Sequence, residues 1–228
     1  MAIALIVVAA VLALAFLPQM WVRRVIASHA HDRPDIADTG AETARRLLDR
    51  MGLPHVKVEE TTVGDHYDPQ DKTVRLMKDN HHGRSLSAIV IAAHEVGHAM
   101  QDATGYPPLA ARTRLAKQAI RMEKIGAIVM LAAPIVVLLS KSPMILLVEM
   151  AAGLFIMSFA MLIHAVTLPV EFDASFRRAL PLLEAAGALQ PQDKPSARRI
   201  LRAAALTYVA AAGMSLLDIA RWLRVLRM

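Results

Sequence analysis

Long apolar runs alternate with charged segments along this chain. Residues 2–17 carry no charged side chain and are followed by Trp21 and a pair of arginines. Two further apolar runs, residues 125–140 and 143–170, are separated by a short turn around Lys141. Because a membrane span needs about 20 apolar residues, the pattern predicts an N-terminal anchor at residues 1–22 and a transmembrane hairpin at residues 125–170.

A fourth apolar run, residues 203–220, is more ambiguous. It contains Asp218 and is followed by Arg221, Arg224 and Arg227, which would have to cross the membrane if the run spanned it. A further span and a helix that lies at the membrane interface therefore compete as interpretations of this run.

The polar segment at residues 23–124 predicts a small α/β unit. Capping residues, glycines and prolines mark its helices, and two short segments alternate apolar and polar side chains as strands do. The predicted elements are a helix capped by Thr39 that runs to about Met51, strands at residues 56–60 and 72–77 that form a hairpin with a long loop, a helix from Leu86 to Ala103 after Ser85, and a basic helix at residues 109–124. Residues 171–228 are predicted to form C-terminal helices.

Composition supports a membrane protein. Of the 228 residues, 55% are hydrophobic and 4% are aromatic, and the mean hydropathy is +0.39. The net charge of +6 comes from lysines and arginines without interleaved aromatic residues, which favours anionic lipid headgroups over nucleic acid as the partner. Residues 22–124 and 171–202 hold 22 of the 26 Lys and Arg, so both segments are predicted to face the cytoplasm.

The chemistry is concentrated in the sequence HEVGH at residues 94–98. On a helix, His94 and His98 project from one face and can bind a single zinc ion. Glu95 lies beside them and can take a proton from a water that the metal activates, which favours peptide hydrolysis. The chain has no cysteine, so a metal must be bound by His, Asp or Glu. A buried glutamate in this apolar helix would be costly unless a metal or a partner compensated its charge.

Several blocks of sequence resemble the YugP-like neutral zinc metallopeptidases of bacterial membranes. They are DHYDP at residues 65–69, VRL at 74–76, GRSLSAIVIAAHEVGHAMQ at 83–101, LPVEFDAS at 168–175 and AALTYVAAA at 204–212. The resemblance implies a gluzincin-type site, distantly similar to that of HtpX-like proteases. It implies His94 and His98 as zinc ligands, Glu95 as the base and Glu171 as the third ligand.

The residues themselves also favour Glu171 as the third ligand. It follows the apolar run that ends at Val170, and Pro169 can kink the chain to aim its side chain at the motif helix. Asp173 is the nearest competitor, but it points to a different helix face. Ser175 shares the Glu171 face, where its hydroxyl can form a hydrogen bond to a histidine.

The sequence therefore predicts a mainly α membrane protein built around a small α/β zincin-like unit. Its parts are an anchor (1–22), a cytoplasmic metallopeptidase segment (23–124), a transmembrane hairpin (125–170) and the third-ligand helix with the C-terminal helices (171–228). It is predicted to be a multi-pass protein of the bacterial cytoplasmic membrane, with one catalytic Zn²⁺ facing the cytoplasm. Its predicted function is endopeptidase cleavage of proteins or peptides associated with that membrane.

Two other functions compete with this prediction. A zinc-stabilised membrane adaptor without catalysis would not need Glu95, because a structural zinc site has four protein ligands and no general base. Metal transport would need polar residues in series through the membrane, where only Glu149 and His164 qualify. The histidines of the polar segments lie in polar or turn-like sequence and are not expected to bind the metal; they are His29, His31, His55, His66, His81 and His82. His164 lies within the third apolar run, where an interhelical hydrogen bond is favoured over a role near the site.

Overall fold

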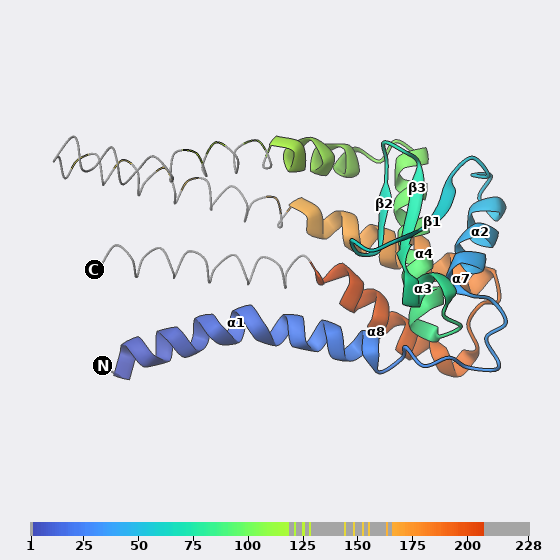
Figure 1. The fold of residues 1–228 in the computed structure, drawn as a ribbon, viewed down its shortest axis with the longest axis horizontal. Coiled ribbons are helices and arrows are strands. Elements are labelled where there is room, and N and C mark those ends of the chain that lie inside the picture. Colours follow the sequence, from blue (N-terminus) through green and yellow to red (C-terminus); the bar gives the residue numbers. More distant parts are fainter. Residues whose placement is uncertain are drawn as a thin grey trace.

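The computed structural model describes residues 2–118 and 166–207, together with the single helical residues 121, 125, 128, 144, 148, 152, 155 and 163. The long N-terminal helix α1 (Ala2–Ala27) projects from a unit of shorter helices and one small sheet (Figure 1). The other elements are α2 (Gly40–Arg50), β1 (Lys57–Thr61), β2 (His66–Asp68), β3 (Thr73–Met77), α3 (Lys78–His82), α4 (Leu86–Ala103), the π-helix η1 (Asp173–Ala179), α7 (Leu180–Ala185), the short 3₁₀ helix η2 (Pro191–Asp193) and α8 (Lys194–Ala205). Residues 107–118 and 166–172 are also helical.

Side-chain caps fix the start of two helices. The Thr39 side chain accepts a hydrogen bond from the Glu42 backbone N–H, and the Glu42 side chain accepts one from the Thr39 backbone N–H, which forms a capping box at the start of α2. The Ser85 hydroxyl accepts a hydrogen bond from the Ala88 backbone N–H at the start of α4. The boundaries predicted for these two helices are confirmed.

The sheet differs from the predicted hairpin. β3 lies in the centre, pairs in parallel with β1 and pairs antiparallel with the three-residue strand β2. Both predicted strands exist, but they do not form a hairpin with each other. The segment between them contributes β2 instead. This strand has only three residues and is flanked by turn residues, so the sequence pattern did not predict it. Tyr67 of β2 lies opposite Val74 of β3, and both side chains are buried.

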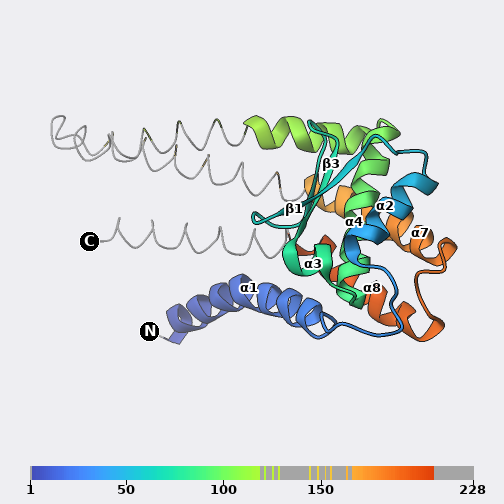
Figure 2. The same ribbon diagram turned by 45° about the vertical axis from the view of Figure 1, so that its right-hand side comes forward.

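Helix α4 forms the centre of the core. It packs against α2, η1 and α8, and β2 and β3 also contact it. Nearly all of its side chains are buried, which explains why it lacks the polar face of a surface helix. Figures 1 and 2 show that the C-terminal end of α1 reaches this unit while the rest of α1 extends away from it. The contact is made through the buried Val22 and Val25.

The predicted membrane architecture is contradicted. Over the described part of the chain, the structure contains no helix of the length and apolarity required to cross a bilayer. The charge-free run at residues 2–17 would cover about 24 Å as a helix, less than the roughly 30 Å of a hydrocarbon core. The following turns of α1 carry Arg23 and Arg24 and pack into the protein core. The prediction of an N-terminal transmembrane anchor within a mainly α membrane protein is therefore wrong.

The other predicted spans fall mostly on residues that the structure does not describe. For the hairpin at residues 125–170, the described part consists of single residues and the helical stretch from 166. Glu149 and His164 lie outside the described residues. At residues 203–220 only 203–207 are described, and α8 ends there at Ala205.

Gly97 allows α4 and η1 to approach closely. A Cβ atom at this position would lie 2.5 Å from the Ala174 carbonyl oxygen, which is a backbone atom and cannot move aside cheaply. We expect Gly97→Ala to lower the melting temperature by roughly 2–12 °C, measured by calorimetry, because overpacking typically costs 1–3 kcal/mol. Helix propensity alone would stabilise the alanine variant by about 1 kcal/mol. A raised melting temperature would therefore contradict the close packing.

Candidate metal centre

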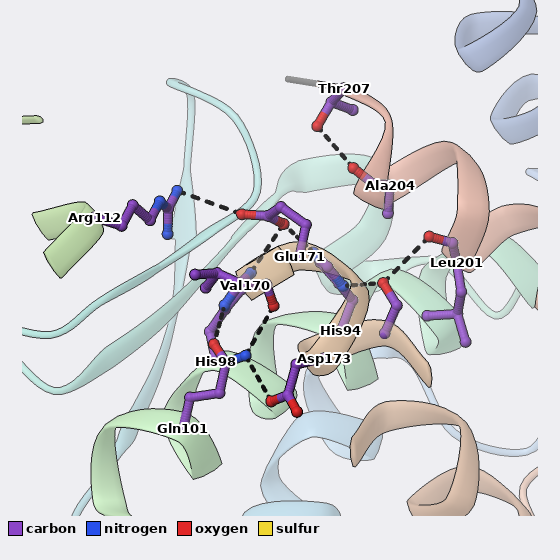
Figure 3. Close-up of polar contacts among 11 residues, drawn as sticks. His94, His98, Gln101, Arg112, Val170, Glu171, Asp173, Leu201, Ala204 and Thr207 are labelled. Atoms are coloured by element: carbon purple, nitrogen blue, oxygen red, sulfur yellow. Dashed lines mark hydrogen bonds and ion pairs between the residues drawn. The ribbon is translucent and has the colours of Figure 1, made fainter. Parts of the chain in front are cut away.

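Two histidines from α4 and one glutamate from the distant helix at 166–172 meet in the protein interior. Glu171 Oε2 lies 3.1 Å from His94 Nε2 and 3.2 Å from His98 Nε2 (Figure 3). The three side chains are almost completely buried, and their ligand atoms all lie within 4.8 Å of one another. The structure thus brings together the three residues that the sequence predicts as metal ligands.

The remaining nitrogen of each histidine contacts a polar side chain. His94 Nδ1 lies 3.0 Å from the Ser175 hydroxyl, which donates its own hydrogen to the Leu201 carbonyl oxygen. His98 Nδ1 lies 2.9 Å from Gln101 Oε1. Both partner oxygens are thus available as acceptors, so each histidine donates a hydrogen bond through Nδ1–H. This tautomer leaves the Nε2 lone pair of each histidine directed at Glu171.

The cluster has the donor set of a catalytic zinc site. Two Nε2 lone pairs and the carboxylate oxygen of Glu171 converge, and no hydrogen is left between them when the histidines are neutral. Such a group of electron-pair donors requires a cation for balance. Two histidines and one carboxylate are a common ligand set for zinc in hydrolases, so the residues fit this metal.

Electrostatics in the cluster favour an ionised Glu171. Burial alone would raise the pKa of its carboxyl group, but the positive charge and the Nε2–H hydrogen bonds that His98 and His94 supply when they are protonated, in place of a metal ion, more than offset this effect. The pKa of Glu171 is held well below its ordinary range. The side chain is therefore an anion, as a metal ligand must be.

Gln101 connects the two ligand-bearing elements. Its amide nitrogen donates hydrogen bonds to the Val170 carbonyl oxygen (2.8 Å) and to Asp173 Oδ2 (2.9 Å), while its amide oxygen accepts from His98 (Figure 3). Arg178 Nε donates a hydrogen bond to the same oxygen of Asp173 (2.7 Å). The sequence reasoning overlooked Gln101, although its position three residues after His98 on the same helix would have placed it beside that histidine.

Asp173 is thus close to the centre but faces away from the ligand atoms. Its carboxylate accepts from Gln101 and Arg178 and is not one of the three clustered ligands. Burial alone would raise its pKa, but these partners lower the pKa overall.

Glu95 lines the same cavity as the cluster. The cavity has a volume of about 380 Å³, and its walls include β2 residues, Arg112 and Thr207. Burial raises the pKa of Glu95 to about 7; His94 lowers it, and the negative charge of Glu171 raises it further. A carboxyl group with a pKa near 7 can both accept and return a proton at neutral pH.

Of the tyrosines that the structure describes, Tyr67 and Tyr106, neither has a hydroxyl in contact with the three clustered ligands. The Tyr67 hydroxyl donates to Asp102 at 2.6 Å, and Lys72 also contacts this carboxylate. The ring of Tyr106 faces the guanidinium of Arg178, 5.4 Å away. The structure gives neither hydroxyl a contact with the metal ligands.

The described histidines outside the motif are not among the three clustered ligands. His66 lines the cavity, and its Nδ1 donates to the Gly64 carbonyl oxygen at 2.7 Å. His81 and His82 form a second group with Glu60, in which Glu60 and His82 are exposed. We assign no function to this surface group.

Comparison with known proteins identifies relatives over nearly the whole chain. A family model described as "Putative neutral zinc metallopeptidase" matches residues 3–227. The chain is also similar to a protein of Bacillus subtilis (strain 168) named "Putative membrane protease YugP", with 38% identity over 220 residues that cover 95% of this chain and 93% of the relative. No solved structure matches the chain significantly. The family resemblance seen in the sequence is confirmed.

Proposed function

The chain belongs to this family of neutral zinc metallopeptidases, and from that premise we propose that it is a zinc-dependent endopeptidase whose active site contains Glu95 and the His94, His98 and Glu171 cluster. One observation carries the proposal. Three electron-pair donors converge on one point in a cavity that also contains a buried carboxyl group with a pKa of about 7.

The proposed reaction is hydrolysis of a peptide bond. Zinc, when bound, supplies a Lewis acid that polarises the scissile carbonyl and lowers the pKa of water. Glu95 accepts a proton from the attacking water as the water oxygen bonds to the carbonyl carbon. It returns this proton to the amine nitrogen as the carbon–nitrogen bond breaks.

Residues around the cluster keep the ligands in their reactive arrangement. Ser175 and Gln101 accept hydrogen bonds from the two Nδ1–H groups and so hold both imidazoles in the tautomer that presents Nε2. Gln101 also ties α4 to Val170, the residue before Glu171. Both ligand-bearing elements are thereby held in place before a metal binds.

A non-catalytic zinc-stabilised adaptor is the alternative from another functional class. A structural zinc site is closed by four protein ligands. Among the described residues, the buried cluster offers three. Three ligands leave one position for water or substrate, and the adjacent Glu95 has no role in a purely structural site. Both features favour the peptidase.

The proposed location is the bacterial cytoplasmic membrane, with the active site facing the cytoplasm and with proteins or peptides associated with the membrane as substrates. The relative from Bacillus subtilis is named a membrane protease. Helix α1 exposes the apolar side chains of Leu12, Phe16, Leu17 and Met20, which suit contact with lipid. The lysines and arginines of residues 22–124 suit the negative surface of the cytoplasmic leaflet.

Metal removal and restoration test the proposed function. We expect the purified protein to contain about one zinc per chain, measured by plasma mass spectrometry, and to cleave members of a peptide library within their chains. A chelator should abolish cleavage, and Zn²⁺ but not Mg²⁺ should restore it, because the ligands are two imidazoles and one carboxylate. A zinc-loaded protein that cleaves no peptide or protein would support the adaptor instead.

A further inference from the structure

Peptide hydrolysis requires a group that stabilises the negative charge developing on the scissile carbonyl oxygen. Hydrogen-bond donors aimed at this oxygen often supply a large part of the rate enhancement. The two tyrosines that the structure describes do not fit this role, because the Tyr67 hydroxyl donates to Asp102 and the Tyr106 ring faces the guanidinium of Arg178. We therefore consider whether a charged residue of the cavity wall stabilises this oxygen.

Arg112 lies in the wall of the cavity, on the helical stretch at residues 107–118. Its side chain is 22% exposed, and its Nη2 atom lies 3.6 Å from Glu171 Oε1 (Figure 3). Among the described residues that line the cavity, Arg112 is the single lysine or arginine. The guanidinium of Arg112 thus faces the metal-binding cluster.

The guanidinium lies beside one functional carboxyl group and shares a cavity with the other. Arg112 and Glu95 both line this cavity. Glu171 turns Oε2 to the histidines and Oε1 to Arg112. Arg112 therefore borders the cavity that holds both the base and the carboxylate ligand, which is where the scissile carbonyl of a bound substrate would lie.

The contact between Arg112 and Glu171 is an ion pair and not a hydrogen bond. The 3.6 Å separation exceeds hydrogen-bonding distance, and Oε1 is buried without a hydrogen-bond partner among the described residues. A guanidinium carries five N–H groups in a planar fork. This fork can serve several partners at once, so contact with Glu171 is compatible with contact to a second anionic oxygen.

We propose that Arg112 is a catalytic residue that donates hydrogen bonds to the scissile carbonyl oxygen as negative charge develops on it. This inference rests on the proposed peptidase function and adds to it the group that stabilises the transition state. The competing role is indirect, with Arg112 holding only Glu171 and thereby supporting metal binding. The two roles differ in what an Arg112 variant loses.

Three variants separate these roles. Arg112→Gln removes the charge, Arg112→Lys keeps it, and Arg114→Gln makes the same chemical change at an exposed residue of the same helix. We expect Arg112→Gln to lower kcat about 10²–10³-fold with little change in KM or zinc affinity. Arg112→Lys should recover part of this loss, and Arg114→Gln should behave as the wild type.

Binding of a transition-state analogue provides a readout that does not depend on turnover. A phosphinic peptide has a tetrahedral, negatively charged centre, so its affinity for zinc-loaded Arg112→Gln, measured by calorimetry, should fall in parallel with kcat/KM. Zinc affinity is measured separately by competition with a chromogenic chelator. Thermal unfolding shows whether each variant is folded. If Arg112→Gln does not fold, the same measurements on Arg112→Lys test the proposal.

Distinct outcomes would overturn the inference and the proposed function. Weak zinc binding with normal kcat at saturating zinc would show that Arg112 acts only through Glu171. Equal analogue affinity in the wild type and Arg112→Gln would exclude a contact with the developing charge, even in the absence of measurable turnover. A wild-type protein that binds zinc but hydrolyses no peptide would instead contradict the peptidase function itself.

Discussion

Glu95→Gln is expected to retain zinc and lose hydrolysis by roughly three to four orders of magnitude. Glutamine has nearly the same size and fills the same buried position, but its amide cannot accept the proton of the attacking water. The three clustered ligand atoms belong to His94, His98 and Glu171, so the substitution leaves the metal site complete. Zinc content is measured by plasma mass spectrometry, and hydrolysis by mass spectrometry of a peptide mixture.

A matched surface variant controls for the chemical change. Glu184→Gln makes the same substitution on α7, at an exposed residue whose ion pair with Lys194 spans 3.6 Å. We expect this variant to keep wild-type activity, because exposed ion pairs contribute little to stability. Full activity in Glu95→Gln would disprove its role as the base. Loss of zinc from Glu95→Gln would show that its carboxylate contributes to metal binding.

Glu171→Ala is expected to weaken zinc binding by more than about 100-fold and to abolish activity, whereas Asp173→Ala should keep most of its zinc. Glu171 supplies the negative ligand atom of the cluster. Asp173 only accepts hydrogen bonds from Gln101 and Arg178, so its removal affects His98 indirectly. Loss of such an outer contact typically costs 10–100-fold in metal affinity, and we expect the lower end here because Gln101 keeps its bond to Val170.

Glu171→Gln helps to separate loss of the ligand charge from loss of packing. Alanine opens space in the buried site, but glutamine nearly preserves the side-chain volume. Zinc affinity is measured by chelator competition on folded protein, with thermal unfolding as the check. If Asp173→Ala lost the metal and Glu171→Ala kept it, the assignment of the third ligand would be wrong.

Local signals predicted the elements that carry the chemistry. Thr39 and Ser85 sit at helix starts where their side chains cap the backbone, and the structure starts α2 and α4 there. Spacing within one helix placed His94 and His98 together, since residues four apart share a face. Family resemblance then linked Glu171 to them across more than 70 residues, a distance that local patterns do not bridge.

Features that depend on tertiary contacts were not predicted, or were predicted incorrectly. The parallel pairing of β1 with β3 depends on contacts between residues far apart in the sequence. β2 has only three residues, too few to show the alternating pattern of a strand. Gln101 appears as an ordinary polar residue until Val170 and Asp173 are packed against it. The N-terminal anchor was predicted from apolar composition, yet the arginine-bearing end of α1 packs on the protein core.

The ligand spacing has a further consequence for the chain as a polymer. His94 and Glu171 are 77 positions apart, and a single ion held by both would join these positions as a cross-link does. Such a link lowers the conformational entropy of the unfolded chain if it persists there, and it adds the binding free energy to folding if it does not. In either case a bound metal would link two distant segments of the sequence and stabilise the folded state.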